Sequence, residues 1–198
     1  MTEDVPTKER ILDSAERLFG ARGFEATSLR DITADANVNL AAVNYYFQTK
    51  ESLIHAVIAR RLGPVNRRRL EMLDAAGPNP TIEQILTAFI QPPLECELAP
   101  VLPLMGKVLA DPQNFKETIF PQHFSEVAAR FHDAFVQAMP HLQEPEVVWR
   151  MHFAIGTMTH ILNWSKLLPS LTEGLCSTDD RKALIDRAVQ FLAAGFRS

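Results

Sequence analysis

The sequence predicts an all-α protein, with an N-terminal unit of three to four helices followed by a helical bundle of five or six. Apolar residues recur at helical spacing along most of the 198 residues, which is the pattern of amphipathic helices. No stretch shows convincing alternation of apolar and polar residues, so no sheet is expected. A glycine- and proline-rich break, GPNP at residues 77–80, is the clearest interruption. Because glycine and proline end regular elements, we predict domains 1–77 and 78–198.

The composition is that of a folded globular chain, since 46% hydrophobic residues suffice for a sizeable core. Cys96 and Cys176 lie far apart, without the spacing of a metal site or a redox motif, so we expect reduced thiols and a cytoplasmic location. The N-terminus lacks the apolar run of a signal peptide. The uncharged stretch between Arg150 and Lys166 is too short and too polar to span a bilayer. No membrane contact is therefore expected.

The formal charge is divided unevenly along the chain, whose net charge is −4. Residues 1–70 carry 11 Lys and Arg against 9 Asp and Glu, a balance of +2. Residues 71–198 carry 9 against 15, a balance of −6. A surface that binds a polyanion is therefore expected in the first third of the chain. Because +2 is modest, the contact must be local rather than a broad basic face.

Two helices are predicted from apolar residues that share one face. The first covers residues 8–22, with this apolar face: Ile11, Leu12, Ala15, Leu18 and Phe19. Gly23 follows it as a C-cap. The other begins at residues 49–52 and turns these residues inward: Leu53, Ile54, Val57, Ile58 and Leu62. Since proline inside a helix removes a hydrogen bond and clashes with the preceding turn, we expect a kink or break at Gly63-Pro64 before the helix resumes to residue 76.

Two short amphipathic segments lie between these helices, at residues 27–47. Ser28 opens the first, and Asp31 completes a capping-box-like pair three residues later. Asn37 stands where the turn requires a positive φ, which asparagine tolerates best among residues other than glycine. Asn39 is a suitable N-cap for the second segment. Two short helices joined by such a turn form a helix-turn-helix, whose second helix enters the DNA major groove.

The second domain is expected to be helical throughout. Its helices are predicted over residues 81–90, 98–110, 114–120, 121–139, 146–168 and 179–196. Pro92 and Pro93 are expected to end the first of them. Pro121 suits the first turn of the fourth, and Pro140 and Pro145 bracket a loop. The helix over residues 146–168 is expected to be the longest.

A resemblance to the TetR family of transcriptional regulators covers residues 11–57, about a quarter of the chain: ILDSAERLFGARGFEATSLRDITADANVNLAAVNYYFQTKESLIHAV. The elements LF..RGFEATS.RDI and YYF..KE.L stand in the family's order and spacing. A motif match of this kind is a hypothesis about structure and function. It implies a dimer that places two recognition helices in successive major grooves of a pseudo-palindromic operator. It also implies a second domain that dimerises and holds an effector.

The sequence departs from the family's usual pattern at two places. The turn is usually Gly-Val-Ser and here is Asn37-Val38-Asn39, which keeps the geometry. The aromatic residue common on the recognition helix falls at Asn44 here, and tyrosine follows at Tyr45. The resulting VNYYF segment is similar to the branch of the family associated with a response to fatty acids or acyl-CoA.

By this resemblance, four residues are expected to bind DNA phosphates: Thr27, Ser28, Tyr46 and Lys50. Such contacts fix the register of the protein on DNA without reading its sequence. Arg30 is expected to reach either a phosphate or a guanine edge. The candidates for contact with base edges are Asn39, Leu40, Ala41, Asn44 and Tyr45. Leu40 and Ala41 offer apolar contact to thymine methyls, and Asn44 can pair with adenine.

The resemblance also implies two kinds of site in the second domain. The residues expected to line an apolar effector pocket are Leu102, Met105, Phe120, Phe124, Phe131, Met151, Ile155 and Met158. Methionine and aromatic walls suit an elongated apolar ligand, although such residues at helical spacing belong to a core more often than to a pocket. The residues expected at the dimer interface are His152, Gly156, His160, Trp164, Ala188 and Phe191.

The sequence thus predicts a homodimeric regulator in the cytoplasm, associated with the nucleoid. It is predicted to be a repressor, released from a palindromic operator by a small apolar effector such as a fatty acid or acyl-CoA. Two alternatives stay open: a DNA-binding regulator that answers to a partner protein or to no ligand, and a helical enzyme that uses His152 or His160. The second has little support, because no nucleophile elbow, glycine-rich phosphate loop or HExxH spacing is present. No catalytic residue, metal or cofactor is therefore expected.

Overall fold

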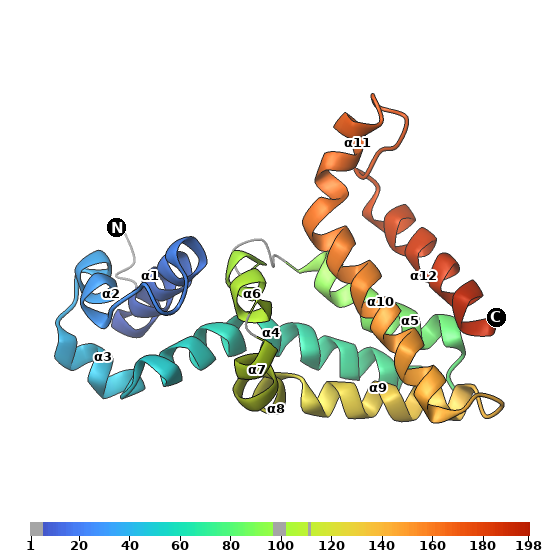
Figure 1. Ribbon diagram of the computed structural model, residues 1–198, viewed down its shortest axis with the longest axis horizontal. Helices are drawn as coiled ribbons and strands as arrows, with labels where there is room; N and C mark the ends of the chain where they lie inside the picture. Colours follow the sequence, from blue (N-terminus) through green and yellow to red (C-terminus); the bar gives the residue numbers. More distant parts are fainter. Residues whose placement is uncertain (1–5, 97–101, 111) are drawn as a thin grey trace. The chain divides into compact units, whose positions relative to one another are not determined.

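The computed structural model describes residues 6–96, 102–110 and 112–198, and every regular element in them is helical (Figure 1). This confirms the all-α prediction. In chain order the helices are α1 (Thr7–Arg22), α2 (Leu29–Ala36), α3 (Leu40–Phe47), α4 (Lys50–Ala75), α5 (Ile82–Glu95), α6 (Leu102–Leu109), α7 (Pro112–Asn114), α8 (Phe120–His123), α9 (Ser125–Ala138), α10 (Glu144–Trp164), α11 (Leu168–Leu171) and α12 (Arg181–Arg197). A π-helical turn, Phe115–Ile119, joins α7 to α8, and a 3-10 turn, Ser165–Leu167, joins α10 to α11. None of the described helices is long and apolar enough to cross a bilayer.

Packing groups the helices into two units. The first comprises Met1–Pro64 and Leu98–Phe124, and the second comprises Val65–Glu97 and Ser125–Ser198. The units divide the chain differently from the predicted domains 1–77 and 78–198, because α6 to α8 belong with the N-terminal helices and the second half of α4 belongs with the bundle. The break at residues 77–80 is a loop between α4 and α5, inside the second unit. A functional boundary at residue 77 stays a prediction.

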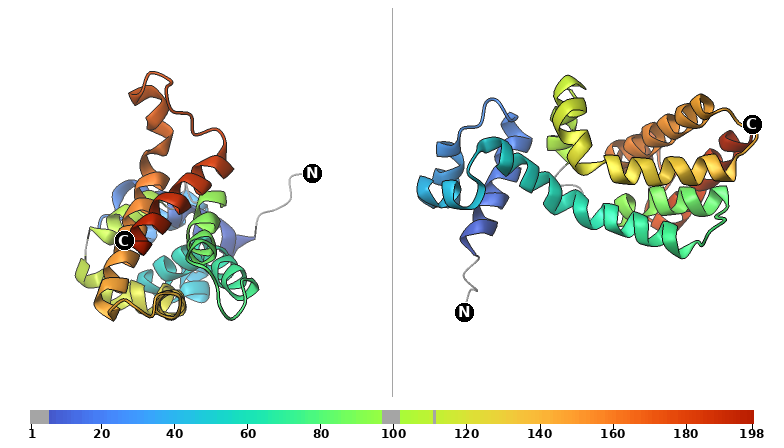
Figure 2. Two further views of the ribbon diagram at one scale, coloured as in Figure 1. Left: turned by 90° about the vertical axis from the view of Figure 1, so that its right-hand side faces the viewer. Right: turned by 90° about the horizontal axis from the view of Figure 1, so that it is seen from below.

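The first unit is built on the apolar faces of its longer helices. Helix α1 packs against α2, α3 and α6, and Figure 2 shows α2 and α3 grouped beside α1. All ten residues predicted to face inward from α1 and α4 are buried. Ile32 of α2 and Val43 of α3 are fully buried as well, and burial of one such side chain contributes about 1.5–3 kcal/mol. Gly23 ends α1 at φ 90°, which confirms the predicted C-cap position.

A buried carboxylate joins α1 to α4. Glu16 is only 4% exposed. Its carboxylate accepts hydrogen bonds from Nη2 of Arg60 and, at 2.9 Å, from Nε of Arg61. Nη1 of Arg60 donates to Asp13 at 2.7 Å. Because a buried charge is costly unless it is paired, these guanidinium groups hold α4 in one register against α1.

Helix α4 runs through Gly63-Pro64 without a break. Its 26 residues also exceed the 21 of α10, so the prediction of the longest helix is wrong. Proline removes the N–H that would donate to the carbonyl of Arg60. Pro64 lies on the exposed side of α4, where water can donate instead. The first packing unit ends at Pro64 and the second begins at Val65.

The second unit packs α5, α9, α10 and α12 around one apolar core (Figure 1). Helix α12 lies against α5, and α9 packs against both α5 and α10. Four phenylalanines form two aromatic pairs in the core. The ring centroids of Phe135 and Phe196 are 4.6 Å apart, and those of Phe89 and Phe131 are 5.1 Å apart. Such pairs add about 0.5–1.5 kcal/mol beyond the burial of their area.

Helix α5 continues through Pro92 and Pro93 to Glu95, so the prediction that these prolines end it is wrong. Each proline leaves one helix carbonyl without its usual N–H donor. For Pro93 that carbonyl belongs to Phe89, and Nε of Arg69 donates to it at 2.8 Å. A tertiary hydrogen bond therefore replaces one that the helix itself cannot make.

Other boundaries in the second half of the chain also differ from prediction. The helix expected over residues 121–139 is divided into α8 and α9 by Phe124, whose φ of −128° is not helical. Pro145 lies in the first turn of α10 rather than in a loop, at a position where its missing N–H is not needed. Helix α10 ends at Trp164, before the predicted residue 168. Most of the helix expected over residues 114–120 is a π-helical turn. The start of the helix expected over residues 98–110 lies outside the described residues.

Two histidines far apart in the sequence meet within the first unit. Nδ1 of His55 on α4 lies 3.0 Å from Nε2 of His123 on α8, and the ring centroids are 5.2 Å apart. One nitrogen must donate and the other accept, so at least one ring is neutral in this contact. Burial lowers the pKa of both histidines, and the charge of His55 lowers the pKa of His123 further.

We expect the protein to lose stability as the pH falls below the ordinary histidine pKa of 6.5. A histidine whose pKa is lowered by folding binds fewer protons in the folded state than in the unfolded state, so acid favours unfolding. Urea denaturation at about pH 7.5 and about pH 5.5 should give the smaller free energy of unfolding at the lower pH. His123→Gln should reduce that difference, and His141→Gln, at an exposed position, should not. An unchanged pH dependence in His123→Gln would contradict the prediction.

Candidate nucleic-acid interface

The helix-turn-helix begins at a complete capping box. Oγ of Ser28 accepts from the N–H of Asp31 at 3.1 Å, and the Asp31 carboxylate accepts from the N–H of Ser28 at 2.8 Å. The Ser28 hydroxyl also donates to this carboxylate, at 2.6 Å. The hydrogen bond from the Ser28 hydroxyl is the main cause that lowers the pKa of Asp31, and the hydrogen bond from the Ser28 backbone N–H lowers this pKa further. The predicted start of α2 is confirmed, and two N–H groups that a helix leaves unpaired are satisfied.

The turn between α2 and α3 has the geometry predicted from its asparagines. Asn37 is left-handed, with φ 52° and ψ 51°. The N–H of Val38 donates to the carbonyl of Thr33 at 3.0 Å, which closes the end of α2. Asn39 caps α3, because its Oδ1 accepts from the N–H of Ala42 at 2.8 Å.

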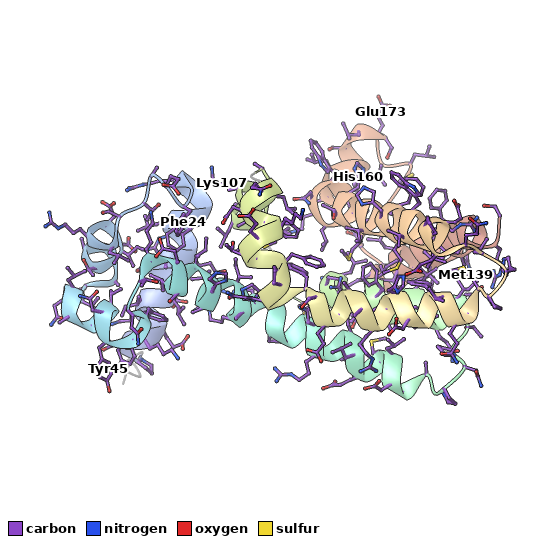
Figure 3. All side chains as sticks on the ribbon, turned by 60° about the horizontal axis from the view of Figure 1, so that its bottom comes forward. Phe24, Tyr45, Lys107, Met139, His160 and Glu173 are labelled. Atoms are coloured by element: carbon purple, nitrogen blue, oxygen red, sulfur yellow. The ribbon has the colours of Figure 1, made fainter. Side chains whose placement is uncertain are left out.

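Helix α3 has one buried face and one exposed face. Val43 and Phe47 are buried, as predicted for core residues. The five residues predicted to contact base edges are all exposed: Asn39, Leu40, Ala41, Asn44 and Tyr45. Because neighbours on a helix are about 100° apart, residues 40, 41, 44 and 45 form a single outward strip. Tyr45 is 81% exposed, and Figure 3 shows it on the outer side of α3.

The position of Thr27 does not fit its predicted contact with a DNA phosphate. It is fully buried. Its hydroxyl faces two backbone carbonyls, those of Gly23 at 2.8 Å and Leu18 at 3.3 Å. Thr27 is therefore a structural residue that ties the end of α1 to the start of α2. Ser28, the next residue, is exposed, and its contact with a phosphate stays a prediction.

The other candidates for phosphate contact reach the surface to different extents. Arg30 is exposed. Tyr46 is 42% exposed and its ring meets that of Tyr45 edge-on at 5.0 Å. Nζ of Lys50, on the first residue of α4, lies 4.2 Å from the centroid of the Phe24 ring. This cation–π contact holds the ammonium beside a helix N-terminus, where the helix dipole favours anions.

A strained residue that sequence reasoning missed separates α3 from α4. Gln48 has φ 64° and ψ −53°, and the N–H of Thr49 donates to the carbonyl of Phe47 at 2.7 Å across it. This is a γ-turn with positive φ, which is rare and strained. Glutamine has no preference for this conformation, so no sequence signal marks it. Strain of this kind gathers at functional sites, and here it sets the direction in which the chain leaves α3.

The residues predicted to line an effector pocket fall in both packing units. Four belong to the first unit: Leu102, Met105, Phe120 and Phe124. In the second unit, Phe131 is fully buried in the core and Ile155 is 43% exposed. Phe131 thus packs in the core and Ile155 lies on the outward side of α10, so contact of either residue with an effector stays a prediction. Met151 and Met158 are partly buried against the core, and their place in a pocket stays a prediction.

Five of the six residues predicted at the dimer interface are exposed: His152, Gly156, His160, Trp164 and Phe191. Ala188 is 6% exposed and belongs to the core rather than to an interface. Two aromatic residues on the same face of α10 were missed, Trp149 (58% exposed) and Phe153 (60% exposed), whose rings stack 5.9 Å apart. Trp149 and Phe153 are four residues apart, and they extend the face of Gly156 and His160 toward the start of α10. This helical spacing in the sequence is the signal that marks them as candidates for the interface.

His152 and His160, which the alternative of a helical enzyme would use, are surface residues that contact aromatic rings. His152 meets Trp149 edge-on, and His160 stacks on Trp164 with centroids 6.3 Å apart. Within the part of the chain that the structure describes, no three His, Cys, Asp or Glu side chains are grouped so as to hold a metal ion.

Comparison with known families matches both parts of the chain. Residues 11–57 match the family described as bacterial regulatory proteins, tetR family. Residues 87–195, more than half of the chain, match the tetracyclin repressor-like C-terminal domain. The chain belongs to the TetR family. This is a family of regulatory proteins, which agrees with the prediction that the chain is not an enzyme.

Individual relatives agree with this assignment over part of their length. The probable HTH-type transcriptional regulator YttP of Bacillus subtilis is 42% identical over 55 residues, which cover 28% of this chain and 27% of YttP. The HTH-type transcriptional repressor BepR of Brucella suis is 30% identical over 91 residues, 45% of this chain and 44% of BepR. The chain thus matches less than half of the length of either relative. The structure of the fatty acid degradation regulator FadR from Bacillus halodurans is similar over 99% of both chains, with a TM-score of 0.62 at 15% identity, a likeness of fold alone.

We expect Gln48→Gly to stabilise the TetR-family fold of this chain by about 1 kcal/mol, because glycine adopts positive φ without a steric penalty. Part of the gain is offset by the larger entropy of glycine in the unfolded chain. Urea denaturation followed by circular dichroism measures the difference. Gln190→Gly is the control: Gln190 is an exposed residue inside α12, where glycine relieves no positive φ and should lower the stability. A Gln48→Gly variant less stable than the parent would contradict the assignment of strain.

Proposed function

We propose that this TetR-family protein is a dimeric transcriptional repressor that binds palindromic double-stranded DNA through α3 and leaves it when a small apolar effector binds. One observation carries the proposal. An eight-residue helix, with a capped start and a buried inner face, exposes Leu40, Ala41, Asn44 and Tyr45 in a single strip. A helix that offers such a strip to solvent suits the major groove, where base edges present donors, acceptors and methyl groups.

The chemistry of the strip matches particular base edges. The amide of Asn44 suits N6 and N7 of adenine, and Leu40 and Ala41 suit the methyl group of thymine. Tyr45 projects furthest, with 81% of its surface exposed. We therefore expect A·T pairs at the positions of each half-site that α3 contacts.

Phosphate contacts come from residues that flank the strip. Ser28 and Arg30 lie at the start of α2, and Tyr46 and Lys50 lie at the junction of α3 and α4. These contacts position the helix without reading sequence. The balance of +2 in residues 1–70, against −6 in the remainder, directs DNA toward the N-terminal helices.

The exposed face of α10 and α12 supports a homodimer. Trp149, Phe153, Trp164 and Phe191 are 54–71% exposed and lie on helices that pack against each other, and exposed large apolar side chains are typical of an interaction surface. Two-fold pairing of this face makes a four-helix bundle from two copies. The bundle would set the separation of the two α3 helices, for which successive major grooves require about 34–36 Å.

Release by an effector requires that the ligand bind one conformation of the dimer more tightly than the other. Repression rather than activation is supported by the name of the relative BepR. The VNYYF segment of α3 supports a fatty acid or acyl-CoA as the effector. Such a regulator acts in the cytoplasm, at the nucleoid.

If operator binding is intact and no apolar compound stabilises the protein in a thermal-shift screen, the second unit answers to a protein partner or to no ligand.

We expect Tyr45→Ala to weaken binding to the operator by about thirtyfold or more, because each copy in the dimer loses a base contact of about 1–3 kcal/mol. The measurement is a fluorescence-anisotropy titration at fixed salt, with a duplex selected from a random-sequence pool. Size-exclusion chromatography should show that the variant remains a folded dimer. Leu175→Ala removes an exposed apolar side chain from the loop before α12 and should leave the affinity unchanged. Parental affinity of Tyr45→Ala would remove this residue from the DNA-reading set.

Lys50→Ala should weaken binding to all sequences alike. If the ammonium neutralises one phosphate, its loss lowers the slope of log affinity against log salt by about one. Titrations of specific and random duplexes over a range of salt concentrations measure this slope. Lys166→Ala removes the same charge from the turn after α10 and should not change it. Equal slopes for Lys50→Ala and the parent would show that the contact with Phe24 is the whole role of Lys50.

A further inference from the structure

Arg69 is a positive charge inside the second unit. It lies on α4 and is 5% exposed. Burial lowers its pKa to about 10, so the guanidinium remains charged at neutral pH. The other buried charged side chain among the described residues is Glu16, and that carboxylate is paired with Arg60 and Arg61. Arg69 has no comparable partner in the part of the chain that the structure describes.

Every hydrogen bond and ring contact of Arg69 within the described residues is with a neutral group. Nε donates to the carbonyl of Phe89 at 2.8 Å, and Nη1 donates to Oδ1 of Asn66 at 3.3 Å. Nη2 lies 3.0 Å from Sδ of Met158 on α10. The guanidinium carbon lies 4.6 Å from the centroid of the Phe89 ring. A thioether is a weak acceptor, so Nη2 has the poorest partner of the three nitrogens.

A structural role accounts for one of these nitrogens. Pro93 leaves the carbonyl of Phe89 without its helical donor, and Nε of Arg69 supplies the missing hydrogen bond. A neutral donor can also satisfy that carbonyl, so the hydrogen bond does not require a positive charge. A buried cation is unfavourable unless an anion compensates it, so this role explains the hydrogen bond and leaves the charge unexplained.

We propose that the guanidinium of Arg69 binds the carboxylate of the effector, with Nη1 and Nη2 as the two donors. The proposal rests on the proposed function, because it names the chemical class of the ligand that the second unit takes. Two parallel hydrogen bonds from a guanidinium fit a carboxylate in geometry and charge. The flexible side chain of Met158 can turn aside from Nη2. Phe89 and Met158 then offer apolar surface to the chain that carries the carboxylate.

The charge inside the second unit favours a free acid over a coenzyme A ester. Arg69 is the buried cation among the described residues of this unit, and one guanidinium matches one carboxylate. An acyl-CoA has a thioester where the acid has its carboxylate, and its negative charges are phosphates remote from the acyl chain. The effector is therefore an amphipathic acid with an apolar chain and a single anionic end.

The test compares octanoate, decanoate, dodecanoate and tetradecanoate with the alcohols of the same chain lengths. Isothermal titration calorimetry on the full-length dimer measures both series at a pH where the acids are ionised. The parent should bind the best acid about tenfold to a hundredfold more tightly than its matched alcohol, the range for hydrogen bonds to a charged group. Arg69→Met should lose this preference while keeping its affinity for the alcohol.

Two further variants separate the ligand contact from a general loss of structure. Arg67→Met removes an exposed charge from the same turn of α4 and should keep the parent's preference for the acid. Arg69→Lys keeps the charge without the planar fork and should show an intermediate preference. If Arg69→Met does not fold, the acid–alcohol comparison in the parent and in Arg69→Lys still decides the question.

Each possible result of these titrations either supports or overturns the proposal. A preference for the acid that falls in the order parent, Arg69→Lys, Arg69→Met supports the proposal. Equal binding of acids and alcohols by the parent, or a preference for acids that survives in Arg69→Met, overturns it and leaves an apolar effector in place. No binding in either series overturns both this proposal and the apolar effector, whereas the Tyr45→Ala titration still tests DNA binding by itself.

Discussion

The left-handed turn at Asn37 is the constraint on which the DNA-facing part of the molecule depends. Because its backbone reverses at φ 52°, α2 and α3 leave the turn in directions that bury Ile32 and Val43 in one core with α1. Helices of eight residues are marginal in water. The caps at Ser28 and Asn39 satisfy N–H groups that such short helices leave unpaired. Caps, turn and shared core therefore stabilise α2 and α3 together.

The other end of α3 is held by a backbone conformation that its own sequence does not favour. Gln48 has positive φ without the side-chain chemistry that suits asparagine to such a turn. The surroundings maintain it, because Phe47 is buried before it and α4 follows in a fixed position. That position depends on Glu16, whose carboxylate binds Arg60 and Arg61 of α4. The direction of the exposed strip on α3 thus depends on ionic contacts between two other helices.

The prolines of α4 and α5 show how tertiary contacts override a local preference. Both Pro64 and Pro93 remove a helix donor, and both helices continue. At Pro64 the exposed side of the helix lets water donate. At Pro93 the carbonyl of Phe89 receives its hydrogen bond from Arg69. A side chain that repairs one helix therefore places a charge in the core of the second unit, and in our proposal the same charge selects an anionic effector.

The helices of the DNA-facing region, their caps and the outward face of α3 are predictable from the amino-acid sequence, because they follow from contacts within a few residues and from the period of a helix. Asn37, Asn39 and Tyr45 lie as their local patterns predict. Long-range packing determines that Thr27 is buried, that α6 to α8 pack with the N-terminal helices, and that Arg69 lies in the core. Burial and charge pairing depend on residues far apart in the chain, and no local pattern carries that information.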